Sequence, residues 1–405
     1  MWRFLSLMVV LPLAALPTAN LQEIESRAIA LKAKGDVAGA LAAYQEAAAL
    51  APKSPRFEDE IGFLLAVLNR RGEAIPHFEH AIALDPRFSP AHFHLGVALW
   101  LDHDQERSLA PLEKAAALDP KNGAYRSKLG QAMEALGRHQ DAIPHLRAAT
   151  TLQPADALAW NNLGAALQKT GDAAGAVDAY RHVVDLEPSN LDARNSLGLM
   201  LVNTRRADEG IAQFRKVLAA SPDNHTARFN LGFAFLQKAE LDQAIAVFRE
   251  LLGRDPGNGA AHYNLGVALK NKDDIDGAKA ELSRALQIDP QLAEAHYMIG
   301  IACWQSGEFE GAVKEMRAAV ALRPDYAQAW FMLGTALKQK GEREPAEEAL
   351  RTAIRLDPSD PGPYNTLAQI LRQKGDIEES KRLFAEGARV KQAKEAQLGL
   401  GMERK

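Results

Sequence analysis

The chain has 405 residues, of which 48 are basic and 52 are acidic, and its formal net charge at pH 7 is −4. This balance excludes the clustered basic surface that proteins use to bind nucleic acid. The single cysteine, Cys303, excludes an internal disulfide, and its place among recurring apolar positions predicts a buried thiol.

The N-terminal residues differ from the rest of the chain. Arg3 precedes an apolar run over residues 4–16, and Ala19 offers a small residue at a plausible cleavage point. A positive charge, a short apolar core and a small residue are typical of a secretory signal peptide. We therefore expect residues 1–19 to direct export to the periplasm or out of the cell, with no transmembrane span in the mature chain. Because Pro17 stands where a small residue is usual, an uncleaved signal that anchors the protein in a membrane is the alternative.

After this segment, prolines recur at a fixed interval of 34 residues. They are Pro52, Pro86, Pro120, Pro154, Pro188, Pro222, Pro256, Pro290, Pro324 and Pro358. We number positions from the preceding proline, so that Gly62 is at position +10 of its repeat. A period of this length is typical of stacked-repeat proteins, in which each repeat packs on its neighbours.

The residues between the prolines predict two helices in each repeat. The packing positions fall at +6, +9 and +13 and again at +22, +26 and +29, with +6 the least consistently apolar, and these steps of three and four place each trio on one helix face. Glycine is frequent at +17, where a left-handed conformation can end the first helix. Small residues at +10 and +22 predict a close helix crossing, and we expect the large residue at +26 to fill the space between successive repeats.

Extended along the chain, this frame defines eleven repeats over residues 21–394. Their predicted boundaries are 21–54, 55–88, 89–122, 123–156, 157–190, 191–224, 225–258, 259–292, 293–326, 327–360 and 361–394. We expect residues 395–405 to extend the last helix as a polar capping tail.

The residues of the fifth repeat match a known family. They are Trp160, Leu163, Gly164, Gly171, Ala176, Tyr180 and Pro188. This pattern resembles the tetratricopeptide repeat, and the resemblance implies an all-α, right-handed superhelical solenoid of antiparallel helix pairs whose first helices line a concave groove. At +6 the usual aromatic is often replaced, and there we expect weaker packing. The replacements are Glu58, His92, Arg126, Arg194, Arg228, His262 and His296.

Two rows of side chains are predicted to face this groove from the later repeats. An aromatic row comprises Phe229, Tyr263, Tyr297 and Phe331 at +7, supported by Phe233 at +11 and Trp304 at +14. An amide row at +15 comprises Asn203, Gln237, Asn271, Gln305, Gln339 and Gln373. These positions lie about 140° round the first helix from its packing face, at roughly 100° per residue.

The two rows suit a peptide ligand. An amide both donates and accepts hydrogen bonds, as a peptide backbone does, and rings accommodate apolar side chains. The alternative is that the rings are packing residues and the amides are ordinary polar surface. A functional amide row is favoured because the first five repeats lack it, with Ala33, Val67, Leu101, Ala135 and Lys169 at the same position.

A second apolar patch is predicted in the early repeats. Its residues are Phe63, Phe93, Val97, Trp100 and Leu101. Exposed apolar area of this kind usually marks an interface, so we expect either a second partner or self-association there.

The sequence contains no recognisable catalytic signature. It has no phosphate-binding glycine loop and no nucleophile elbow. The acidic stretch from Asp273 resembles a calcium loop, but Lys272 and Ser283 occupy ligand positions, and His77 and His80 offer only two ligands. We therefore expect no enzyme, no cofactor and no metal site.

The predicted function is a non-enzymatic scaffold that binds peptide segments or partner proteins in its groove, in the cell envelope or outside the cell. Some members of the family bind a terminal carboxylate with lysine, arginine and asparagine, but asparagine is absent from +11 in every repeat, which disfavours that mode. The alternative is an assembly or regulatory subunit of an envelope complex that contacts its partners through its outer surface.

Overall fold

The computed structural model describes residues 20–402, and every regular element in that range is an α-helix. The first helices of the pairs are α1 (Leu21–Ala33), α3 (Pro55–Val67), α5 (Ser89–Leu101), α7 (Gly123–Ala135), α9 (Ala157–Lys169), α11 (Leu191–Asn203), α13 (His225–Gln237), α15 (Gly259–Asn271), α17 (Ala293–Gln305), α19 (Ala327–Gln339) and α21 (Pro361–Lys374). The second helices are α2 (Val37–Leu50), α4 (Arg71–Leu84), α6 (Gln105–Leu118), α8 (His139–Leu152), α10 (Ala173–Leu186), α12 (Ala207–Ala220), α14 (Leu241–Arg254), α16 (Ile275–Ile288), α18 (Phe309–Leu322), α20 (Arg343–Leu356) and α22 (Ile377–Met402). The predicted all-α solenoid of helix pairs is therefore confirmed. The predicted signal peptide, residues 1–19, lies outside the described residues.

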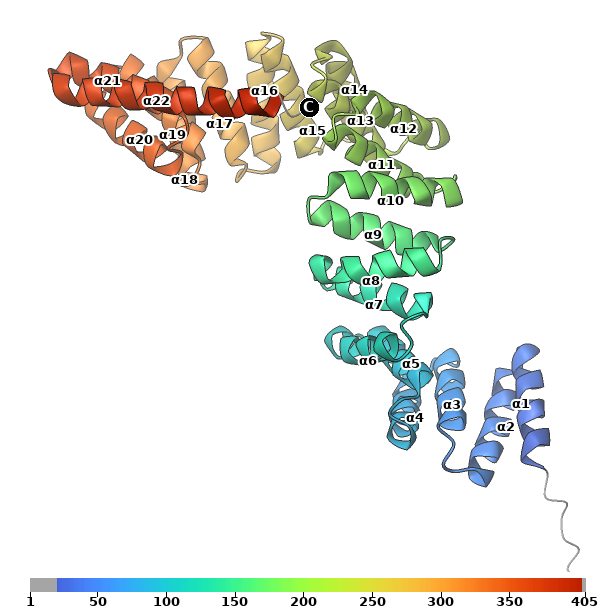
Figure 1. Ribbon diagram of the computed structural model, residues 1–405. Helices are drawn as coiled ribbons and strands as arrows, with labels where there is room; N and C mark the ends of the chain where they lie inside the picture. The colour runs from blue at the N-terminus through green and yellow to red at the C-terminus, as the bar shows by residue number, and fades with distance from the viewer. Residues whose placement is uncertain (1–19, 403–405) are drawn as a thin grey trace, which may run out of the picture. The chain divides into compact units, whose positions relative to one another are not determined.

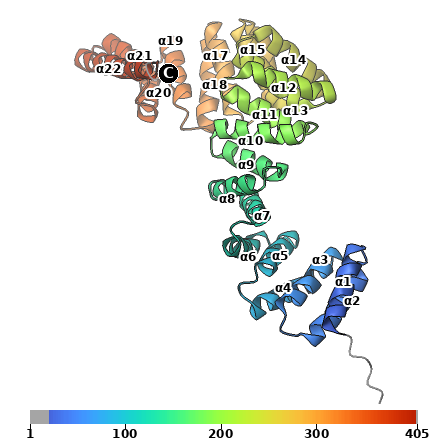
Figure 2. The same cartoon turned by 45° about the vertical axis from the view of Figure 1, so that its right-hand side comes forward.

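The chain divides into two compact blocks, an N-terminal block (Met1–Ala193) and a C-terminal block (Arg194–Lys405). Within each block, successive helices pack side by side in chain order (Figures 1 and 2). In the C-terminal block the first helices α13, α15, α17, α19 and α21 also contact one another in succession. Helices on the inner side of a curved stack approach each other in this way, so these first helices form the inner wall of the block.

The first and second helices of each pair cross closely because position +10 has no side chain. A Cβ on Gly232 would lie 2.8 Å from Cε1 of Phe248, the large residue at +26 of the same pair, and eight other repeats repeat this arrangement. The sequence predicts that the +26 side chain fills the space between repeats. It lies first against the glycine of its own pair, and Phe78 shows that it also reaches the next repeat, with its ring centroid 5.7 Å from that of His94.

Position +17 adopts the left-handed conformation in all eleven repeats. The six predicted glycines have φ between 75° and 94°. Five other residues share the conformation, with φ between 58° and 64°, namely Asn69, His103, Arg205, Ala239 and Asp273. The tight turn between the paired helices is therefore set by the fold, and glycine is the least strained residue for it.

Side-chain caps explain where several helices begin. Asn258 accepts a hydrogen bond from the N–H of Ala261 at 3.0 Å at the start of α15. Asp274 accepts one from Gly277 at 3.0 Å at the start of α16. Such caps satisfy backbone donors that have no partner within the helix, so the acidic stretch that resembles a calcium loop serves as a helix start.

The expectation of weak packing at +6 was wrong. His92, Arg228 and His262 are buried there. In seven repeats the +6 side chain donates a hydrogen bond to the carbonyl of the proline six residues earlier. The donors are His92, Arg126, Trp160, Arg228, His262, Trp330 and Tyr364. The property that these seven side chains share is therefore a polar hydrogen on a long side chain, which indole, phenol, imidazole and guanidinium groups can all supply.

Candidate functional site

The predicted aromatic row lies along the inner wall of the C-terminal block, divided between two core clusters. Phe229 and Phe233 on α13 pack against one cluster, and the Phe229 ring meets that of Phe248 edge-on at 5.9 Å. Tyr263, Tyr297, Trp304 and Phe331 pack against the next cluster. All six rings are half-buried. Each ring therefore contributes to packing while part of its surface stays exposed to solvent.

The tyrosines of this row are joined by residues that the sequence analysis missed. The ring centroids of Tyr297 and Tyr326 lie 5.0 Å apart, and the Arg323 guanidinium lies 3.6 Å from the Tyr326 ring centroid. Arg323 also forms an ion pair with Glu294, with Nη1 and Oε1 2.6 Å apart. Because Tyr326 comes from the loop before α19, no helical periodicity pointed to it.

Burial disfavours the ionised form of these tyrosines. It raises the pKa of Tyr326 to about 12 and raises the pKa values of Tyr263 and Tyr297 above their usual value. None of the three hydroxyls hydrogen-bonds to another residue in the described part of the chain. These three hydroxyl groups, two on first helices and one in the loop before α19, can therefore still donate a hydrogen bond to a ligand.

The amide row lies at the end of the first helices. Asn203, Gln237, Asn271, Gln305 and Gln339 are the last residues of α11, α13, α15, α17 and α19, and Gln373 is the last but one of α21. All six are exposed, and none of their side chains hydrogen-bonds to another residue between 20 and 402. The row therefore has free donors and acceptors at regular intervals along the block.

Four of the five residues of the second apolar patch line one pocket in the N-terminal block. Phe63, Phe93, Val97 and Leu101, from α3 and α5, surround a cavity of about 440 Å³. Trp100 is not part of the lining, and its ring centroid lies 5.6 Å from Nζ of Lys128. The lining is completed by Ala66, Val67, Arg71, Phe78, His94, Ala98 and Lys128. The basic residues in this pocket were not predicted from the sequence.

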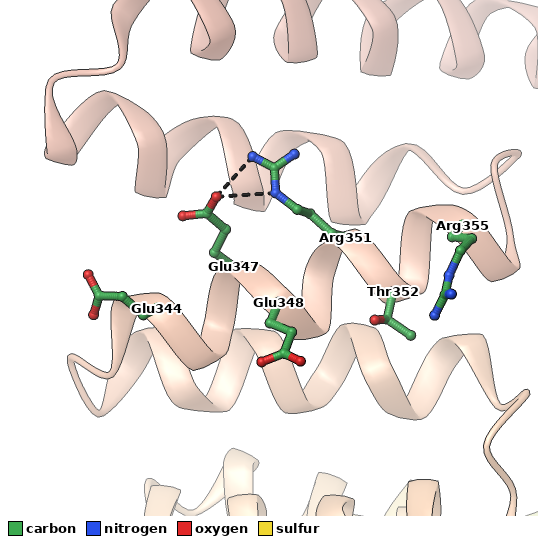
Figure 3. A pocket seen from close by; sticks show the side chains of 6 residues that line it. All are labelled: Glu344, Glu347, Glu348, Arg351, Thr352 and Arg355. Atoms are coloured by element: carbon green, nitrogen blue, oxygen red, sulfur yellow. Dashed lines mark hydrogen bonds and ion pairs between the residues drawn. The ribbon is translucent and has the colours of Figure 1, made fainter.

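A second hollow, of about 510 Å³, follows one face of the second helix α20 (Figure 3). Its side chains are mostly charged and largely paired, since Glu347 contacts both Arg351 and Lys374 at 2.9 Å. The hydrogen bond from Lys374 holds the pKa of Glu347 below its usual value. This hollow lies on the row of second helices, away from the predicted groove residues.

The residues considered for chemistry have structural partners. Cys303 is buried as predicted, and burial raises its pKa. Nδ1 of His77 lies 2.7 Å from Oε2 of Glu58, and Nδ1 of His80 lies 3.4 Å from the same oxygen. Within residues 20–402, no three histidine, cysteine or acidic side chains are grouped so as to hold a metal ion. No described helix is long and apolar enough to cross a membrane.

Two family profiles, both described as the tetratricopeptide repeat, match the sequence. One matches residues 64–123, 127–190, 164–225, 195–259 and 297–361, and the other matches residues 236–302. Together they cover well over half of the chain. No curated protein matches it.

Several solved structures are similar. A tetratricopeptide repeat protein from Parabacteroides merdae has 15% sequence identity and a TM-score of 0.51, covering 62% of this chain and 98% of its own. Yeast Tom70 has 16% identity and a TM-score of 0.48, covering 91% and 92%. MamA has 26% identity and a TM-score of 0.39, covering 41% and 97%. The likeness to the Parabacteroides protein is one of fold, and with the profile matches it shows that the chain belongs to the tetratricopeptide repeat family.

Proposed function

We propose that the protein is a non-enzymatic scaffold that binds extended peptide segments along the first helices of its C-terminal block. One observation carries this proposal: six exposed side-chain amides, without partners in the described chain, lie at the ends of successive first helices, and four of these helices, α13, α15, α17 and α19, also carry half-buried rings. Polar surface with no binding role would not need the same functional group in six successive repeats.

The spacing of the amides suits an extended chain. Packed helices lie about 8–10 Å apart, which corresponds to about three residues of extended peptide at roughly 3.3 Å each. Each of the six repeats can then offer one amide to the ligand backbone, and the four repeats of α13, α15, α17 and α19 can also offer a ring to a nearby side chain. Backbone recognition of this kind tolerates varied ligand sequences, as a scaffold with several clients requires.

We also propose that the protein works in the cell envelope or outside the cell, because residues 1–19 have the composition of a signal peptide. Sequencing the N-terminus of protein isolated from its native cells tests this proposal. A start at Asn20 supports export with cleavage, whereas an intact Met1 supports a membrane anchor.

Photo-crosslinking distinguishes groove binding from binding through the outer surface. A photoreactive residue replaces Gln305, at the end of the first helix α17, or Gln287, an exposed residue of the second helix α16. Groove binding predicts crosslinks from position 305 and none above background from position 287. The reverse pattern would instead support the alternative function, a complex subunit that uses its second helices.

A further inference from the structure

The pocket in the N-terminal block has a rigid aromatic floor. The His94 ring lies 5.4 Å from the ring centroid of Phe63 and 5.7 Å from those of Phe78 and Phe93. Its Nδ1 lies 2.8 Å from Oδ1 of the buried Asp59, which fixes the ring in place. A concave surface held by packing and hydrogen bonds at its base is preorganised, so its side chains lose little conformational entropy when a ligand binds.

The rim of the pocket is apolar and open to solvent. The exposed fractions of Val67 and Leu101 are 54% and 47%, which are high values for large apolar residues. The volume of about 440 Å³ lies within the range of pockets that enclose small ligands or a few side chains. Closing this rim would bury apolar surface, so a ligand with a bulky apolar group is favoured.

The two charged residues of the pocket lining have the same sign. They are Arg71 and Lys128, and the lining contains no acidic residue. The acidic residues of α3 near it are already paired, since Asp59 bonds to His94 and Glu60 to Lys32. Arg71 and Lys128 contact no carboxylate among the described residues.

Lys128 is the more informative of these two cations. It is half-buried, and Nζ lies 3.0 Å from Oε1 of Gln131, its one hydrogen-bond partner in the described chain. Burial lowers its pKa, which shows that its surroundings disfavour the charge. A carboxylate brought into the pocket would relieve this cost and would gain a charge-assisted hydrogen bond.

We propose that this pocket binds an internal peptide segment in which a bulky apolar side chain stands next to an aspartate or glutamate. The apolar side chain enters between Phe63 and Phe93, and the acidic side chain pairs with Lys128 and Arg71. The site goes beyond the proposed function, which concerns the first helices of the C-terminal block. It would give the protein a second, charge-selective binding site.

Selection from a random peptide display library on the full-length protein tests this proposal. The predicted outcome is a set of peptides in which a large apolar residue adjoins an acidic one. The consensus peptide is then made with a fluorescent label and an amidated C-terminus, which removes the terminal carboxylate, and its affinity is measured by anisotropy. Lys128→Gln should weaken binding about ten-fold or more, as expected for the loss of a charge-assisted hydrogen bond.

Matched controls separate the pocket from other sites. Lys114→Gln removes an exposed lysine of α6 and should leave the affinity unchanged. Replacing the acidic residue of the peptide by its amide should weaken binding to the wild-type protein more than binding to the Lys128→Gln variant, in which only Arg71 remains to pair with the acidic group. Leu101→Asp should abolish binding with an unchanged helical circular dichroism spectrum, whereas Gln237→Ala/Gln305→Ala in the C-terminal block should have no effect. The two binding sites can thus fail independently.

Several results would overturn the proposal. The first two are selected peptides without acidic residues and an unchanged affinity of the consensus peptide in Lys128→Gln. Displacement of the peptide by dodecanoate would instead show a lipid site, and a dimer of the protein that dissociates in Leu101→Asp would show that the pocket is a self-association surface. Failure to select any peptide whose binding depends on Leu101 would overturn it equally.

Discussion

At the scale of single residues, position +17 shows how the fold overrides local preference. Its left-handed conformation is predictable from glycine in six repeats, such as Gly171 with φ of 85°. It is not predictable at Ala239, where φ is 58°, because alanine favours a right-handed helix. The turn is kept there by the helices on either side, at the expense of backbone strain.

Ala239→Gly should therefore stabilise the protein by about 0.5–1 kcal/mol, because relief of left-handed strain exceeds the extra entropy of glycine in the unfolded chain. The measurement is the urea midpoint of unfolding followed by circular dichroism. Ala246→Gly, an exposed position inside α14, is the matched control and should destabilise by about 1 kcal/mol. Changes of the same sign in both variants would show that Ala239 is not strained.

Because of Tyr326, the free energy of unfolding should decrease as the pH rises in the alkaline range. Its pKa of about 12 in the folded protein exceeds the ordinary value of 10.0, so the unfolded chain loses this proton first. The contribution is fully present below pH 10.0 and is lost as the pH rises towards about 12. Between about pH 9 and about pH 11, the free energy of unfolding should fall less in Tyr326→Phe than in the wild type. Equal losses in urea titrations would contradict this assignment.

At the scale of helices, the contact at +6 links the start of each first helix to the preceding turn. Nε1 of Trp330 donates to the carbonyl of Pro324 at 2.9 Å, and Nε2 of His262 bonds to that of Pro256 at 3.1 Å. Nδ1 of His262 also lies 2.6 Å from Oε2 of Glu281 on the second helix. The sequence revealed the varied residue types at +6, but their shared acceptor is a backbone carbonyl, which no residue type encodes.

Replacing these donors by phenylalanine should therefore cost different amounts. Trp330→Phe removes one hydrogen bond and should cost about 1 kcal/mol, whereas His262→Phe also leaves Glu281 without this partner and should cost about 1–3 kcal/mol. Denaturant unfolding of both variants checks the order. A larger loss in Trp330→Phe would mean that ring packing, rather than the hydrogen bonds, controls stability at +6.

At the scale of the whole molecule, the period of 34 residues predicted the helix pairs and the rows that their first helices present. Helical geometry alone placed the amides of +15 on the exposed end of each first helix. Three features depended on tertiary contacts and escaped prediction: the Tyr326 loop, the place of Lys128 in the N-terminal pocket, and the division between Ala193 and Arg194. Each involves residues that no single repeat brings together.

Because each helix pair packs mainly on its neighbours, a destabilising substitution should lower the stability of its own pair and of the adjacent pairs only. Gly232→Ala forces a Cβ to within 2.8 Å of Phe248 and should destabilise its pair by about 1–3 kcal/mol. Hydrogen exchange should then accelerate in α12 to α16 and stay unchanged in α20 to α22. Uniform acceleration over the whole C-terminal block would show that the block unfolds as one cooperative unit.

Peptide binding along the first helices is tested most directly by comparing two double variants of the Leu101→Asp chain, in which the N-terminal pocket is blocked. A peptide is selected on this chain, and its affinity is measured by anisotropy. Gln237→Ala/Gln305→Ala should weaken binding about ten-fold or more, since two amide hydrogen bonds are lost, while the exposed second-helix pair Gln243→Ala/Gln287→Ala should leave it unchanged. Equal affinities in both variants, or a loss only in the second-helix pair, would contradict a peptide-binding groove on the first helices.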